Sequence, residues 1–166
     1  MLYHVSDEPN IKLFKPRPSQ FTDNPAVWAI DSEHLRNYLL PRDCPRVTFY
    51  ALSTTTQEDR QRFLGTSKAV VAVEGKWLPR ILACKLYCYH FSPEDFECLD
   101  EGAGYFVNYK MVVPKRMEVF KHLLEELVSR QVEVRIMPNL WHLREAVVNS
   151  TLQYSNIRMR NASPQE

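Results

Sequence analysis

His4 and Ser6 are the two residues near the start of the chain whose types and spacing suit ligand binding. They lie in the run 2–6 (LYHVS), which is typical of a β-strand. Side chains two positions apart on a strand point to the same face, so an imidazole and a hydroxyl could together hold the oxygens of one ligand. The alternative is a half-buried strand histidine that is hydrogen-bonded to a neighbouring carbonyl. The sequence leaves both interpretations open.

Trp28 and the carboxylates of Asp100 and Glu101 are the next candidates. Trp28 lies in the expected strand 26–30, where its indole could stack on a flat ligand ring or pack in the core. Asp100 and Glu101 are two adjacent carboxylates. They end the acidic segment 93–101, so a solvated acidic turn is the simpler interpretation of both residues.

Two arginines and two residues after a glycine turn complete the candidate site. Arg42 and Arg46 flank a proline-rich loop, and their guanidinium groups could bind a pyrophosphate or form surface salt bridges. Tyr105 and Asn108 follow the turn 102–104 (GAG), which permits close approach of a ligand to the backbone, and we expect them to line the pocket.

Composition excludes several classes of partner. The 166 residues include 21 basic and 20 acidic side chains, and the formal charge of +1 provides no general attraction to nucleic acid or anionic lipid. An RNA-binding role would need a basic patch around Arg42, Arg46 and Arg158. The longest apolar run, 69–73, is too short to span a membrane, and the chain is expected to be cytoplasmic. Four cysteines without a CxxC pair predict free thiols, and no metal site is expected.

The pattern of apolar residues predicts an α+β fold with a mixed or antiparallel sheet and flanking helices. We expect one domain over residues 1–166, built on a single core, with a polar tail from about residue 155. The expected strands are 2–5, 26–30, 46–52, 69–73, 85–91, 105–113 and 132–137, and the expected helices are 33–40, 54–64, 76–82, 114–130 and 140–152.

Four segments, LYHVS, VWAID, KLYCYHF and AGYFVNYKMVVP, resemble in their order the strands of small bacterial ADP-ribosyltransferase-like proteins. The resemblance implies an ADP-ribosyltransferase-like fold and NAD as the substrate. In that family a first-strand histidine in a His-x-Thr/Ser setting binds NAD, an aromatic residue on the next strand stacks on nicotinamide, and a later acidic residue assists catalysis. His4 and Ser6 match the first motif, Trp28 stands at the aromatic position in place of the usual tyrosine, and Asp100 or Glu101 is the nearest acidic residue. The segment 41–75 has no counterpart that we can align.

Nearly the whole chain also looks like an uncharacterised family of small bacterial proteins, through VWAID…YLLPRDCPRVTFY, AGYFVNYKMVVP and LQYSNIRMRNA. That resemblance implies no activity. Three functions follow as hypotheses: transfer of ADP-ribose from NAD to an unknown acceptor, non-catalytic binding of a nucleotide or a protein, and RNA-directed transfer or binding. The partner expected from the first two is a nucleotide or another small molecule.

Overall fold

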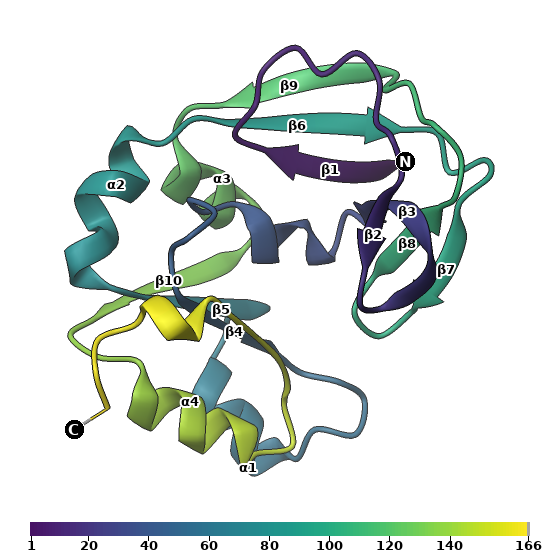
Figure 1. Cartoon of the computed structure of the whole chain (residues 1–166). Coiled ribbons are helices and arrows are strands. Elements are labelled where there is room, and N and C mark those ends of the chain that lie inside the picture. The colour runs from purple at the N-terminus through teal and green to yellow at the C-terminus, as the bar shows by residue number, and fades with distance from the viewer. Residues whose placement is uncertain (166) are drawn as a thin grey trace. The chain divides into compact units, whose positions relative to one another are not determined.

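The computed structural model describes residues 1–165 and divides the chain into two compact units (Figure 1). Unit 1 consists of Met1–Tyr38 and Lys85–Lys121, and unit 2 consists of Leu39–Cys84 and the chain from His122 onward. Each unit has its own cluster of buried apolar side chains, where the sequence predicted one core. The single domain over residues 1–166 stays a prediction.

Unit 1 is an antiparallel sheet with one short helix. The sheet order is β7-β8-β3-β1-β6-β9, and β2 pairs with the outer part of β3. The elements are β1 (Leu2–Ser6), β2 (Arg17–Ser19), β3 (Thr22–Ile30), a 3-10 helix (His34–Tyr38), β6 (Leu86–Phe91), β7 (Glu97–Asp100), β8 (Tyr105–Asn108) and β9 (Arg116–Phe120).

The sheet of unit 1 forks between β1 and β3. These two strands share one register pair, Tyr3 with Ile30, whereas β1 pairs with β6 from Leu2 to Ser6. In Figure 1, β1, β6 and β9 run side by side, while β3, β8 and β7 form a second group. The main-chain groups of β1 and β3 next to the Tyr3–Ile30 pair do not bond to each other, so they need other hydrogen-bond partners.

The loop between β1 and β2 packs on one face of this sheet. The hydroxyl of Tyr89 donates to the carbonyl of Glu8 at 2.7 Å and accepts from the amide of Ile11 at 3.0 Å. Phe14 exchanges two main-chain hydrogen bonds with Val112 and packs in the core with Leu2, Val27, Ala29, Tyr89 and Phe91. This face of unit 1 is therefore closed by the chain itself.

Unit 2 has a four-stranded sheet with helices. The order is β10-β5-β4-β11, in which β10 and β5 are parallel and the other pairs antiparallel. The elements are β4 (Arg46–Tyr50), α1 (Gln57–Asp59) with a π-helical turn (Arg60–Leu64), β5 (Ala69–Glu74), a 3-10 helix (Gly75–Trp77) leading into α2 (Leu78–Ala83), α3 (Leu123–Ser129), β10 (Val132–Met137), α4 (Trp141–Val148), β11 (Gln153–Ile157) and a last 3-10 helix (Met159–Asn161). Every residue of β4 and β5 is buried.

The α+β class with antiparallel and mixed sheets is confirmed, but the expected helix 114–130 is right only in its second half. Arg116–Phe120 is strand β9, paired with β6, and the helix α3 begins only at Leu123. Met117 and Phe120 have helical spacing, yet the open edge of β6 offers main-chain partners that a local helix would forgo.

The expected polar tail from residue 155 is also partly a strand. Gln153–Ile157 forms β11, which pairs with β4 from Gln153 opposite Tyr50 to Ile157 opposite Arg46. The residues of β11 are mostly polar, so local pattern alone does not mark them as a strand. Pairing with the buried strand β4 decides their conformation.

Candidate functional site

The register of unit 1 separates His4 from Trp28. Tyr3 pairs with Ile30, so these two side chains share a face, and alternation places Trp28 with Ile30 and His4 on the opposite face. The prediction that His4, Ser6 and Trp28 face a common cleft is therefore wrong. His4 and Ser6 do share a face, which they occupy with Tyr89 and Tyr87 of β6.

His4 bridges the fork of the sheet. Its Nδ1–H donates to the main-chain carbonyl of Trp28 at 2.9 Å. Its ring lies edge-on to Phe14, with centroids 5.0 Å apart, and 6.4 Å from the ring of Phe91. These contacts agree with the structural interpretation of His4, a half-buried strand histidine bonded to a neighbouring carbonyl.

Three further candidate site residues accept hydrogen bonds that stabilise turns. Ser6 Oγ accepts from the amide of Glu8 at 3.0 Å, and Asn108 Oδ1 accepts from the amide of Lys110 at 2.9 Å. Asp100 Oδ1 accepts from the amide of Ala103 at 3.0 Å, in the same exposed turn as Glu101. Each bond stabilises the backbone locally. These hydrogen bonds engage the three oxygens with backbone amides, and they do not orient the oxygens toward a ligand.

Arg46 is a structural residue, so its prediction as a pyrophosphate ligand is wrong. Its side chain is buried, at 2% exposure, and donates to the carbonyls of Cys44 at 2.9 Å and Pro41 at 2.6 Å. Arg42 is exposed, and both arginines belong to unit 2, whereas the other candidates belong to unit 1. The basic patch that an RNA-binding role needs thus lacks one of its three arginines.

Trp28 forms a corner of aromatic rings with Phe21 and Tyr105, which we call the aromatic corner. The centroid of Trp28 lies 6.3 Å from that of Phe21 and 5.7 Å from that of Tyr105, with interplanar angles of 79° and 84°. Trp28 and Tyr105 are half-buried, and Phe21 is 70% exposed. Rings set at right angles and open to solvent are suited to bind a flat or cationic group.

Charged residues share the face of the aromatic corner. Asp100 is in register with Tyr105, and Glu97 with Val107, so both carboxylates lie on the same face as Trp28. Arg17 is in register with Ala26, which places it on that face near Trp28. Its exposed guanidinium forms no ion pair within the residues that the structure describes.

The position of Tyr105 is set by a close contact at Gly104. Gly104 has φ of 70°, and a Cβ there would lie 2.3 Å from His34 Nδ1 and 2.6 Å from Asp31 Oδ2. His34 Nδ1 donates to the Asp31 carboxylate at 2.8 Å, and the Tyr105 hydroxyl meets that of Tyr38 at 2.7 Å. The glycine turn thus allows the tight approach that the sequence predicts, but to side chains of the chain itself.

Sequence reasoning missed Phe21 and Arg17. Phe21 stands among polar residues in the turn between β2 and β3, and an aromatic side chain in a polar turn is a signal of exposure. Arg17 lies between Pro16 and Pro18, outside every strand and helix expected from the sequence. Its placement depends on the pairing of β2 with β3.

A family model matches residues 3–162. The chain belongs to DUF6886, a family of unknown function. No curated protein matches the chain, and no solved structure matches it. Within residues 1–165, no helix is both long and apolar enough to span a bilayer.

Proposed function

We propose that unit 1 of this DUF6886 protein is a nucleotide-binding module that holds the nicotinamide ring of NAD in the aromatic corner, without transferring ADP-ribose. The observation that carries the proposal is the open, perpendicular arrangement of Phe21, Trp28 and Tyr105. The nicotinamide ring of oxidised NAD is flat and positively charged. Aromatic rings attract such a group through stacking and through cation–π interaction.

The charges on this face support the same ligand. Asp100 and Glu97 favour a cationic ring beside Tyr105 through attraction between opposite charges, which water screens in part because both carboxylates are exposed. Arg17 supplies a guanidinium on the same face, which matches the oxygens of a pyrophosphate. It takes the role for which the sequence suggested Arg42 and Arg46.

The contacts of His4 and Asp100 argue against transfer chemistry. Cleavage of the bond between nicotinamide and ribose would need groups placed within bonding reach of one sugar. The side chain of His4 lies on the opposite face of the sheet from Trp28 and donates to a main-chain carbonyl. Asp100 stabilises its own turn. The proposal therefore takes NAD as the ligand from the resemblance to ADP-ribosyltransferases, but it does not take the transfer reaction.

Titration calorimetry with NAD tests the proposal. We expect saturable binding to the wild type and a loss of about tenfold in affinity for Trp28→Leu, the usual size of a base-stacking contribution. Trp77→Phe is the matched control, because Trp77 is a buried tryptophan of unit 2 and its loss should leave the affinity unchanged. Arg17→Gln should weaken binding of NAD but not of nicotinamide mononucleotide to the same extent, because the pyrophosphate is absent there.

Three results would count against the proposal. Absence of binding at millimolar NAD would refute it, and equal affinities of the wild type and Trp28→Leu would refute the assignment of the site. Incorporation of label from radioactive NAD into any acceptor in a lysate, lost in His4→Ala, would refute the claim that unit 1 binds without catalysis.

A further inference from the structure

In unit 1, two segments outside the main strands form a short two-stranded ribbon. Phe14, in the loop between β1 and β2, exchanges main-chain hydrogen bonds of 2.8 and 2.9 Å with Val112, in the connection between β8 and β9. Both side chains pack against the core of unit 1. Neighbours along an extended chain point the other way, so Leu13, Met111 and Val113 face away from the core, at 40%, 63% and 68% exposure.

The ribbon is fixed on the sheet, which keeps these three apolar side chains in water. Phe14 packs edge-on against Phe91, with ring centroids 4.9 Å apart. At the end of the second segment, the amide of Lys115 donates to the carbonyl of His90 at 2.8 Å. The exposed side chains therefore cannot turn inward unless these contacts are broken.

Exposed lysines flank the three apolar side chains. They are Lys12, Lys15, Lys110 and Lys115, and none of them forms an ion pair within residues 1–165. The stretches 9–22 and 102–117, which contain both segments, include six basic residues and no Asp or Glu, although the formal charge of the whole chain is only +1. Positive charge is therefore concentrated here. We call the four lysines, with Leu13, Met111 and Val113, the lysine-apolar patch.

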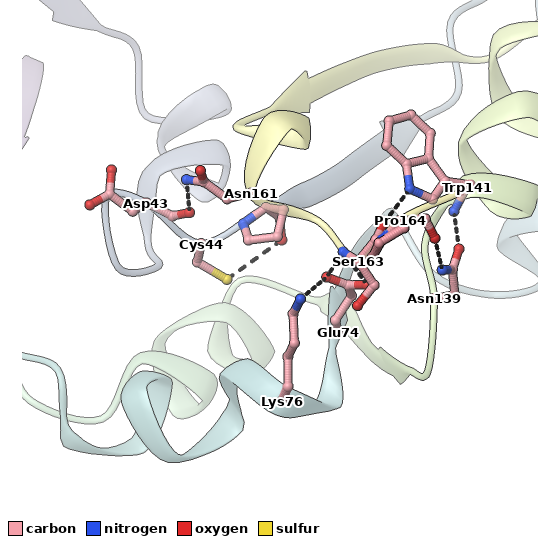
Figure 2. Close-up of polar contacts among 10 residues, drawn as sticks. Asp43, Cys44, Glu74, Lys76, Asn139, Trp141, Asn161, Ser163 and Pro164 are labelled. Atoms are coloured by element: carbon pink, nitrogen blue, oxygen red, sulfur yellow. Dashed lines mark hydrogen bonds and ion pairs between the residues drawn. The ribbon is translucent and has the colours of Figure 1, made fainter. Parts of the chain in front are cut away.

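Polar side chains near the end of unit 2 are in the opposite situation. Figure 2 shows that Glu74 accepts from the amide of Ser163 at 3.0 Å. Trp141 and Asn139 donate to the carbonyls of Ser163 and Pro164. These groups are satisfied by the chain itself. The lysines of the patch, which the rest of the described chain leaves without an ion pair, are available to a partner that carries negative charge.

The chemistry of the lysine-apolar patch fits the surface of an anionic bilayer. Exposed aliphatic side chains gain free energy when they leave water, and lysines are attracted to anionic headgroups. Interfaces with proteins are depleted in lysine, and single-stranded nucleic acid is bound on aromatic stacking platforms, whereas the apolar side chains of the patch are aliphatic. A bilayer accepts both parts of the patch, with the ammonium groups among the headgroups and the aliphatic groups below them.

We propose that the lysine-apolar patch binds unit 1 to a bilayer that contains anionic phospholipids, with its three aliphatic side chains inserted at the boundary between headgroups and acyl chains. The site is separate from the aromatic corner. Phe14 packs in one core cluster with Val27 and Ala29, which alternate with Trp28 along β3. The patch therefore belongs to the opposite face of the sheet, and the proposal does not depend on the binding of NAD.

Sedimentation of the full-length protein with vesicles tests the proposal. The vesicles contain phosphatidylcholine alone, or phosphatidylcholine with about 30% phosphatidylserine. We expect binding only to vesicles of the second kind. The bound fraction should fall as the salt concentration is raised, because salt screens the attraction between the lysines and the headgroups.

A charge-reversal variant tests the lysines. Lys110→Glu combined with Lys115→Glu should lower the partition coefficient at least about tenfold, because each basic residue near an anionic surface contributes on the order of a factor of five. The matched control is Lys68→Glu combined with Lys121→Glu, which changes the net charge equally at exposed positions outside the patch. The control should stay within about twofold of the wild type, apart from the lysines of the patch being intact.

A second variant tests insertion of the aliphatic side chains. Met111→Ser combined with Val113→Ser should lower the partition coefficient about tenfold, since the lysines alone hold the protein at the surface less tightly. The matched control is Leu82→Ser combined with Val128→Ser, which removes side chains of similar exposure, 62% and 63%, from helices of unit 2. This control should bind as the wild type does.

The proposal is overturned if the protein binds neither kind of vesicle or both kinds equally. Unchanged binding of either patch variant, or losses in the controls as large as those in the patch variants, would also contradict it. Polyuridylate and polyglutamate are tested with the same lysine variant. If one of them binds through these lysines while the vesicles do not bind, the patch recognises that polymer and not a bilayer.

Discussion

The sheets of the two units differ in how their faces are covered. In unit 2 both central strands, β4 and β5, are buried at every residue, and their buried charges bind the chain itself: Arg46 binds the loop before β4, and Glu74 binds the segment at 161–164. In unit 1 one face is closed by the loop that holds Phe14, while Trp28 and Tyr105 stay half-exposed on the other. A sheet buried on both faces has room only for structural polar groups, whereas a partly open face leaves aromatic and charged side chains available to a ligand.

The largest effect expected from a single substitution is at Gly104. Gly104→Ala places a Cβ against His34 and Asp31 at a residue with positive φ, and we expect a loss of about 3 kcal/mol in the free energy of unfolding. Urea denaturation measures it. The matched control is Gly102→Ala, where the nearest atom lies 3.5 Å away and the change should be small. Equal effects of the two substitutions would show that the contact at Gly104 does not set this turn.

Arg46→Met tests whether buried charge in unit 2 is structural. The Cys44 carbonyl loses the guanidinium donor, and the Pro41 carbonyl keeps only the amide of Cys44, so we expect about 2 kcal/mol less stability, since a buried acceptor left without a partner costs about 1–3 kcal/mol. Arg42→Met is the control, because Arg42 is exposed and its loss should change stability by less than about 0.5 kcal/mol. Hydrogen exchange followed by mass spectrometry would locate the loss in unit 2.

The Cys44 thiol makes unit 2 sensitive to alkaline pH. Burial raises its pKa from 9.0 to about 11, against the opposing influence of Arg46. The unfolded chain therefore loses this proton at a lower pH than the folded chain, and stability falls between pH 9 and about 11, by on the order of 2 kcal/mol. Cys44→Ala should flatten that part of the stability profile. An unchanged profile would show that Cys44 is not the group responsible.

The smallest effect is expected at Tyr38, whose hydroxyl is bonded to that of Tyr105. Tyr38→Phe removes one hydrogen bond of 2.7 Å and should cost about 1 kcal/mol in unfolding free energy. Because Tyr105 keeps its ring against Trp28, the affinity for NAD should change by less than about threefold. A large loss of affinity would mean that the hydroxyl pair, and not the ring, orients the aromatic corner.

Much of the fold could be predicted from local pattern. Strand 132–137 is confirmed with the same bounds, and strand 69–73 is extended by Glu74 alone, because runs of branched apolar residues strongly favour a strand. The region 114–130 could not be predicted in this way. Its first part becomes β9 through pairing with β6, a segment about thirty residues earlier in the chain.

The arrangement of the candidate site residues depends on strand pairing, which the local sequence pattern does not reveal. The position of Trp28 in a strand was predicted, but its face relative to His4 follows from the pairing of Tyr3 with Ile30. Arg42, in the loop 41–45, and Arg46, the first residue of β4, differ for a similar reason. Arg46 is buried because carbonyls of that loop surround its guanidinium, whereas Arg42, in the same sequence context, is exposed.

The most direct test of the aromatic corner compares oxidised with reduced NAD in calorimetric titrations of the wild type and Trp28→Leu. The two ligands share the same phosphates and riboses, but only the oxidised nicotinamide ring is positively charged. We predict that the wild type binds the oxidised form about two- to thirtyfold more tightly, as a cation–π contribution of about 0.5–2 kcal/mol implies, and that Trp28→Leu reduces the difference to the part contributed by the neighbouring carboxylates. Equal affinities in the wild type, or tighter binding of the reduced form, would contradict the proposed site.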